Sequence, residues 1–164
     1  MATIGLQFVL GSGISSRFIA WYGNGYGGFS HVDGILSDGR LLGARSDKVG
    51  GQPAGVHIRP PGYEKWLKRT QVTFEVTAAV YKDWEANLRA KIGTPYDVTS
   101  IWGFVTGRQE STDGHWICSQ LQLNALQHIK KVAFPLPMPA HQITPNTCLA
   151  IAAAIGGKVV VCPT

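Results

Sequence analysis

Two segments far apart in the chain carry the residue types of a thiol nucleophile. Cys118 lies in residues 115–121, which are typical of a helix start, and His31 lies in residues 29–36, which are typical of a strand. A thiol attacks strongly only as its thiolate, and a helix N-terminus and a nearby imidazole are two ways of lowering its pKa. A fold that brings His31 to Cys118 would therefore create a Cys/His nucleophilic site.

The elements that must position these residues follow from hydrophobic periodicity. Alternation and β-branched content predict strands over 4–10, 30–36, 40–45, 56–59 and 71–76, whereas spacings of three and four predict helices over 14–22, 78–92 and 118–129. Residues 37–39 read as a hairpin turn, which places His31 on the first strand of a β-hairpin. The apolar face of helix 118–129 includes Cys118, so the cysteine is expected to be buried.

Composition indicates one domain over residues 1–164. The chain is 45% hydrophobic and 15% charged, which is enough to bury a core without disulfides. Its cysteines at 118, 148 and 162 have no paired short spacing, which argues against a disulfide framework or a zinc knuckle and favours a reducing compartment. We expect Cys148 and Cys162, both in apolar surroundings, to be core residues.

The N-terminal twenty residues read as structure rather than as an export signal. They lack a basic leader, are broken by glycine, and carry Arg17 where a signal core should be uncharged. No apolar run is long enough for a transmembrane helix. The expectation is a cytoplasmic or otherwise non-exported protein without a signal peptide.

The net charge of +5 raises nucleic acid as a candidate partner. The charges form only short groups, at Lys65, Lys68 and Arg69 and at Lys130 and Lys131, which is typical of solvated surface. Nucleic acid is not expected.

Two patterns suggestive of a cofactor or a metal are set aside. Residues 23–28 have the GxGxxG spacing, but a predicted helix precedes them and a strand follows, the reverse of a dinucleotide loop, so we read them as a loop beside His31. His115 and Cys118 could share a metal, yet no second pair has ligand spacing. No cofactor and no metal are expected.

The order of the motifs resembles a known family. A Ser30-His31 strand, a hairpin, the segment 93–97 around Tyr96, and then 116–121 around Cys118 resemble the circularly permuted relatives of the NlpC-type cell-wall peptidases. These relatives include the YiiX/YaeF-like group and, more distantly, lecithin retinol acyltransferase. The resemblance covers about residues 4–129. It implies an α+β, circularly permuted papain-like fold with an antiparallel sheet packed against the cysteine helix.

The resemblance also implies a function. Cys118 matches the family's nucleophile, His31 its general base, and Tyr96 is placed to lend its hydroxyl to the oxyanion. The implied activity is a cysteine peptidase or amidase acting on a cell-wall peptide such as a peptidoglycan fragment; a lipid acyl hydrolase or acyltransferase is the alternative. Taken singly, each residue has a plainer reading, because buried cysteines and loop tyrosines usually only pack.

One departure from the family bears on activity. The family usually carries a third polar residue, often His or Glu, on the strand after the hairpin and just before an alanine, where this chain has Gly43 and Ala44. Asp33, on the same strand face as His31, a backbone carbonyl or an ordered water could each orient the imidazole instead. The departure also favours a further alternative, a catalytically weak binding or structural module.

Overall fold

The computed structural model describes residues 1–12, 28–99, 114–129 and 143–163. The predicted helix 14–22, the glycine-rich loop 23–27 and Lys130-Lys131 lie outside these residues. The described elements are, in chain order, β1 Ala2–Gly11, β2 His31–Ile35, β3 Leu41–Arg45, β4 Gly55–Arg59, β5 Trp66–Val76, α2 Ala78–Arg89, α4 Cys118–His128, α5 Pro145–Ala154 and β6 Lys158–Cys162.

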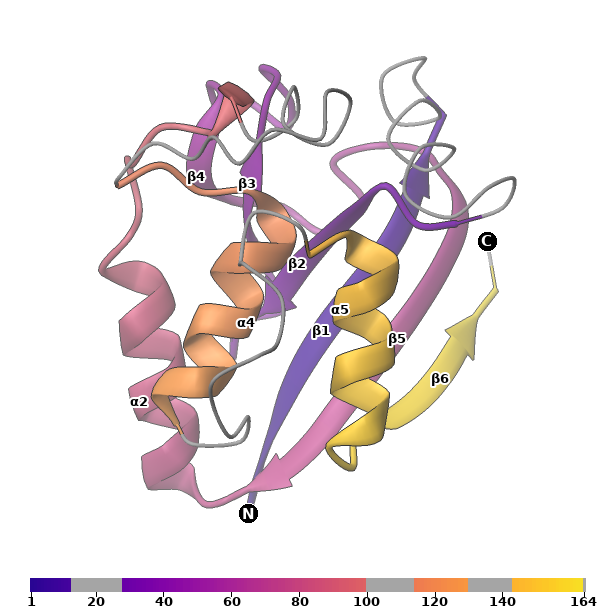
Figure 1. Cartoon of the computed structure of the whole chain (residues 1–164), viewed down its shortest axis with the longest axis vertical. Coiled ribbons are helices and arrows are strands. Elements are labelled where there is room, and N and C mark those ends of the chain that lie inside the picture. Colours follow the sequence, from indigo (N-terminus) through magenta and orange to yellow (C-terminus); the bar gives the residue numbers. More distant parts are fainter. Residues whose placement is uncertain (13–27, 100–113, 130–142, 164) are drawn as a thin grey trace.

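The strands form one antiparallel sheet in the order β4-β3-β2-β1-β5-β6. Helices α2, α4 and α5 lie on the same face of this sheet (Figure 1). The expected α+β class, with an antiparallel sheet packed against the helix that carries Cys118, is therefore confirmed at this level. Within the described residues, no helix combines the length and the apolar character needed to cross a membrane.

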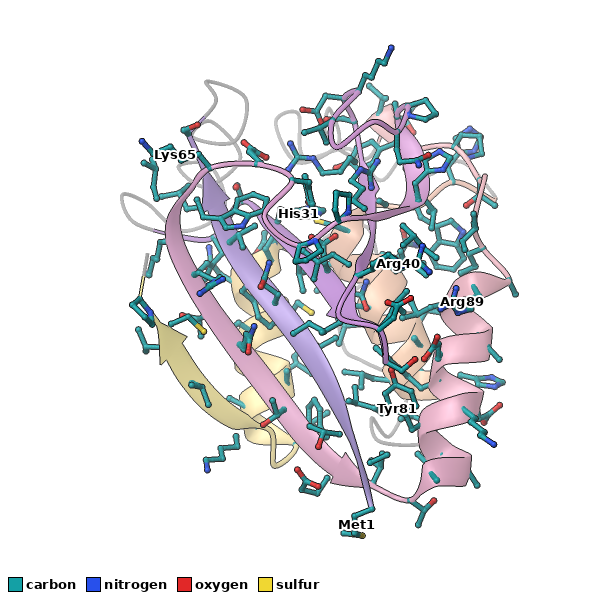
Figure 2. The ribbon with its side chains drawn as sticks, turned by 180° about the vertical axis from the view of Figure 1, so that it is seen from behind. Met1, His31, Arg40, Lys65, Tyr81 and Arg89 are labelled. Atoms are coloured by element: carbon teal, nitrogen blue, oxygen red, sulfur yellow. The ribbon has the colours of Figure 1, made fainter. Side chains whose placement is uncertain are left out.

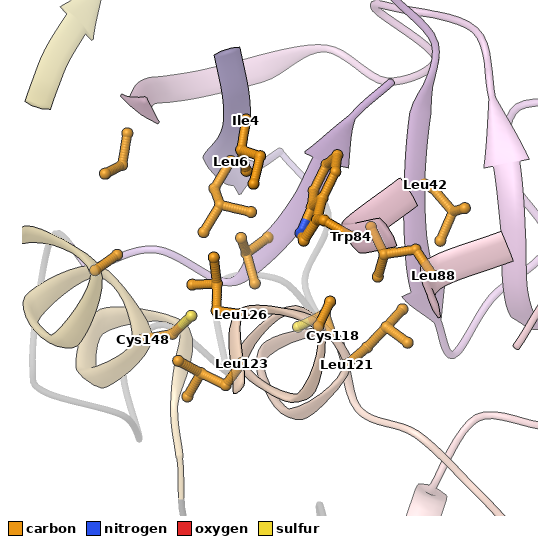
Figure 3. Packing of buried hydrophobic residues seen from close by; sticks show 14 of the residues in the cluster. Ile4, Leu6, Leu42, Trp84, Leu88, Cys118, Leu121, Leu123, Leu126 and Cys148 are labelled. Atoms are coloured by element: carbon orange, nitrogen blue, oxygen red, sulfur yellow. The ribbon is translucent and has the colours of Figure 1, made fainter. Parts of the chain in front are cut away.

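The core lies between the sheet and the helices. Figure 3 shows Ile4 and Leu6 of β1 facing Leu126 of α4 and Trp84 of α2, with Cys148 of α5 nearby. All five side chains are fully buried. This hydrophobic layer packs α4 against the sheet and so determines where the N-terminal end of α4 lies relative to the strands.

The sheet opens between β2 and β3, and this opening positions the candidate site. Among the described residues, β2 pairs with β3 only through Gly34–Leu42 and Ile35–Leu41, although β3 continues its pairing with β4 as far as Arg45. Figure 1 shows β2 leaning away from β3 toward its own N-terminal end. His31 begins β2 and therefore lies in the widening part.

Several predicted boundaries and environments change. β5 begins at Trp66 rather than at 71, and α2 ends at Arg89 rather than at 92. Helix α5 and strand β6 are not among the predicted elements. Cys148 is buried as expected, but the core placement of Cys162 is wrong, because β6 is an edge strand whose other residues are all exposed.

Candidate active site

His31 and Asp33 are adjacent on one face of β2. Because side chains alternate along a strand, residues two apart point the same way. The Oδ1 atom of Asp33 lies 2.8 Å from Nε2 of His31. The two residues are 4% and 1% exposed, respectively, so the contact is shielded from water. Of the three candidates for orienting His31, the structure therefore places Asp33 against the ring.

Cys118 is the first residue of α4, and this helix start lacks a side-chain cap. The N-cap residue is Ile117, which makes no capping hydrogen bond, whereas Thr77 caps α2 and Thr144 caps α5. The first-turn N–H groups of a helix have no intrahelical partner, and they carry the positive end of its dipole. At α4 this field acts on the cysteine itself.

The thiol of Cys118 meets the imidazole of His31. Burial alone would raise the pKa of Cys118, but the charge of His31 and hydrogen bonds from His31 and the Val32 backbone lower it below its ordinary value. Cys118 is 5% exposed. The structure thus joins two side chains that lie 87 positions apart in the sequence.

His31 is correspondingly biased toward its charged form. Burial lowers the pKa of His31, but the charges of Asp33 and Cys118, together with hydrogen bonds to both, raise it to about 9. The pKa of Asp33 is lowered below its ordinary value. Burial raises this pKa, but His31, Tyr63 and Arg59 together lower it by more. A thiolate–imidazolium pair supported by a carboxylate is the state that these fields favour.

Gly43 leaves the space that Asp33 occupies. A Cβ atom built on Gly43 would lie 1.9 Å from Oδ1 of Asp33 and 3.3 Å from Nε2 of His31. Any other residue at this position would therefore collide with the Asp33 carboxylate. The absence of a side chain at position 43 and the presence of the Asp33 carboxylate on β2 therefore belong to one arrangement.

Tyr96 is held beside the start of α4 by backbone pairing. It forms a parallel bridge with Trp116, in which the Trp116 N–H donates to Pro95 and the Asp97 N–H donates to Trp116, both at 3.1 Å. Burial and the nearby charge of Cys118 raise the pKa of the Tyr96 hydroxyl. The hydroxyl is therefore a neutral donor close to the thiol.

Tyr63 is a site residue that sequence reasoning missed. It lies between β4 and β5, and its hydroxyl donates to Oδ2 of Asp33 at 2.9 Å. It follows Pro60, Pro61 and Gly62, which signal a turn and give no hint of a contact with β2. Only the packing of this loop against the sheet reveals it.

The structure covers only some of the remaining candidates. In the described ranges, no group of three or more His, Cys, Asp or Glu side chains is arranged to hold a metal ion. The GxGxxG segment falls almost wholly in residues 13–27, outside the part of the chain that the structure describes. His57 lies partly exposed on β4, and His141 is outside the described residues.

Comparison with known proteins assigns no relative. No protein-family model matches this chain, and a search of curated proteins finds no significant match.

Proposed function

We propose that this protein is a thiol hydrolase with a circularly permuted papain-like fold. The observation that carries the proposal is the unbroken chain of contacts from the Cys118 thiol through the His31 ring to the Asp33 carboxylate. It begins at a helix N-terminus that no side chain caps. A nucleophile, a base and an orienting group in mutual contact are what covalent catalysis of acyl transfer requires.

The proposed reaction follows from these roles. The Cys118 thiolate attacks the carbonyl carbon of an amide, and the carbonyl oxygen becomes an oxyanion. The Cys118 backbone N–H and the Tyr96 hydroxyl donate to this oxygen. The imidazolium of His31 then gives its proton to the leaving amine as the C–N bond breaks. A water molecule, deprotonated by neutral His31, attacks the thioester and releases the acid and the thiol.

Asp33 keeps His31 productive through both halves of the reaction. Its carboxylate accepts from Nε2, which leaves Nδ1 as the nitrogen for the thiol and stabilises the imidazolium. The glycine at position 43 was the reason to consider a catalytically weak module. Because Asp33 occupies the space that Gly43 leaves, this departure no longer argues for lost activity.

The substrate proposal rests on the resemblance in motif order. An amide bond in a cell-wall peptide is the first candidate, and the acyl ester of a lipid is the alternative, since the same thioester chemistry serves both.

Competitive alkylation tests the activated thiolate without a substrate. Exposure alone ranks Cys162 first, because it is partly exposed whereas Cys118 and Cys148 are buried. The proposal predicts the opposite order: iodoacetamide at pH 7 labels Cys118 before Cys162 and Cys148 in the folded protein. Peptide mapping by mass spectrometry reads the order, and labelling of Cys118 no faster than Cys162 would contradict the proposal.

Turnover is then measured on two substrate classes. Purified peptidoglycan fragments test amide cleavage by the appearance of new amino groups, and vesicles containing phospholipid test acyl release. We expect hydrolysis of the first class that disappears in Cys118→Ala and persists in Cys162→Ser, a matched control on the edge strand. Cleavage that persists in Cys118→Ala would contradict the assignment of Cys118 as the nucleophile.

A further inference from the structure

The loop between β4 and β5 brings a tyrosine to the second oxygen of the Asp33 carboxylate. Oδ1 of Asp33 is engaged by His31 at 2.8 Å, and Oδ2 accepts from the Tyr63 hydroxyl at 2.9 Å. Each carboxylate oxygen therefore has its own partner. A carboxylate held at both oxygens cannot rotate without losing one of two hydrogen bonds.

The Tyr63 ring is itself tightly placed. The guanidinium groups of Arg45 and Arg59 lie 5.7 and 5.8 Å from its centroid, and the Trp66 ring meets it edge-on at 5.1 Å. On another side, a Cβ on Gly50 would come within 2.8 Å of the Tyr63 Cβ, so this backbone approaches closely. Such packing fixes where the hydroxyl points.

Arg59 ties this ring to the backbone around the site. Arg59 is 1% exposed, and its guanidinium donates to the carbonyls of Gly43 at 3.1 Å, Pro53 at 3.1 Å and Val49 at 3.2 Å. The same side chain therefore packs on Tyr63 and holds the strand position that leaves room for Asp33. Arg59 therefore contacts both the strand position that leaves space for Asp33 and the tyrosine that donates to Asp33.

We propose that Tyr63 is a positioning residue of the site, whose hydroxyl locks the Asp33 carboxylate in the orientation that holds His31 for Cys118. The inference rests on the proposed thiol hydrolase function and extends the Cys118–His31–Asp33 chain of contacts by one residue. The Tyr63 hydroxyl donates to Asp33, so its proposed effect on the thiol passes through that carboxylate.

Charged groups from every neighbouring element bear on the pH dependence. Asp33 faces His31 on its own strand, Arg59 from β4 and Tyr63 from the loop. His31 also interacts electrostatically with Cys118 of α4 and with Asp47 of the β3–β4 connection. Arg45 interacts electrostatically with Tyr63. Burial and the charge of Asp33 hold the pKa of Tyr63 well above its ordinary value, so the phenol keeps its proton and remains a donor.

Removing the hydroxyl changes the acid side of the pH profile. Without the Tyr63 donor, one force that lowers the pKa of Asp33 is gone, so the carboxyl takes up a proton at higher pH. A neutral Asp33 no longer favours the imidazolium, and the thiolate loses the charge that stabilises it. The acid limb of Cys118 reactivity therefore moves to higher pH.

The experiment compares Tyr63→Phe with Tyr81→Phe in the full chain. Tyr81 lies on α2, well separated from His31 in Figure 2, and its ring packs on Trp84. The rate of Cys118 alkylation by iodoacetamide is measured across pH for each variant. On the acid limb we expect Tyr63→Phe to lower the rate about tenfold, as for one lost hydrogen bond to a charged group, and Tyr81→Phe to leave it unchanged.

Two further variants separate positioning from packing. In an Asp33→Asn background, adding Tyr63→Phe should change the alkylation rate little, because the carboxylate on which Tyr63 acts is already gone. Tyr63→p-aminophenylalanine keeps both the ring and a donor, and should restore most of the wild-type profile. Because it preserves the ring contacts, it also tests the idea if Tyr63→Phe fails to fold.

The outcomes are distinct. A wild-type profile in Tyr63→Phe, or an equal loss with and without Asp33, overturns the positioning role. Failure of the proposed function looks different, because Cys118 would then show no enhanced alkylation in the wild-type protein.

Discussion

Gly43→Ala is the smallest change that should disable the site. Its new methyl carbon would start 1.9 Å from Oδ1 of Asp33, whereas ordinary contacts begin at 3.4 Å. The oxygen must therefore retreat by about 1.5 Å, the difference between those two distances. Gly43 lies within the β3–β4 ladder, opposite His57, so the strand cannot easily move instead.

The displacement breaks the contact that orients His31. A hydrogen bond of 2.8 Å between His31 and Asp33 that lengthens by this amount is lost. Breaking a buried charge pair costs roughly 3–5 kcal/mol, which we expect as a lower free energy of unfolding. Removing the orienting member of a catalytic triad lowers kcat by up to about 10⁴-fold, so we expect a loss of about 10²- to 10⁴-fold in turnover.

Three measurements check this prediction. Urea unfolding gives the stability change, hydrolysis gives the turnover, and the rate of Cys118 alkylation at pH 7 reports the thiolate directly. Gly5→Ala is the matched control, because the three atoms nearest to its new Cβ, at 3.0 to 3.4 Å, all belong to Ile35 and none to the site. We expect Gly5→Ala to leave the alkylation of Cys118 unchanged.

A swap of the two positions gives the sharper test. A Cβ at position 43 would lie 3.3 Å from Nε2 of His31, so a short carboxylate there can reach the same nitrogen once Asp33 is removed. Asp33→Gly combined with Gly43→Asp should recover at least part of the activity lost in Asp33→Gly alone. Full activity in Gly43→Ala, or no difference between it and Gly5→Ala, would refute the steric reasoning.

Two other predictions concern pH and the oxyanion. The pKa of His31 is raised to about 9 from 6.5, so its stabilising contribution is fully present below pH 6.5 and is lost as the pH rises through about 9. In urea titrations, the difference in free energy of unfolding between wild type and His31→Gln should therefore shrink over that pH window. A difference that stays constant with pH would contradict this prediction. Tyr96→Phe should lower turnover about 100-fold, the cost of one oxyanion donor, while leaving Cys118 alkylation at pH 7 within about twofold; an equal loss in both assays would mean that Tyr96 only packs.

Local patterns predicted the elements that carry the site. Period-two alternation indicated β2 and β3, the turn at 37–39 joined them, and Gly39 adopts the positive φ of 80° expected at such a turn. The start of α4 at Cys118 also agrees with its prediction. These features depend on neighbours in sequence, which is why single-chain periodicity suffices for them.

The C-terminal elements α5 and β6 also have local sequence signals. Thr144 followed by Pro145 is typical of a helix start, and a β-branched run follows Gly156 and Gly157. The apolar residues of α5 show little periodicity, because this short helix packs between α4 and β5. Its burial, and the exposure of Cys162 on the edge strand, depend on the order of strands in the sheet.

By itself, the sequence determined the candidate nucleophile and base and the shared strand face of His31 and Asp33, because these follow from residue type and local period. Only the tertiary structure decided that Asp33 rather than a backbone carbonyl or water holds the ring, because that depends on β2 and β3 diverging beside a glycine. The same holds for Tyr63, which reaches Asp33 from 30 positions away along the chain. Contacts across that separation are set by packing, which no local pattern encodes.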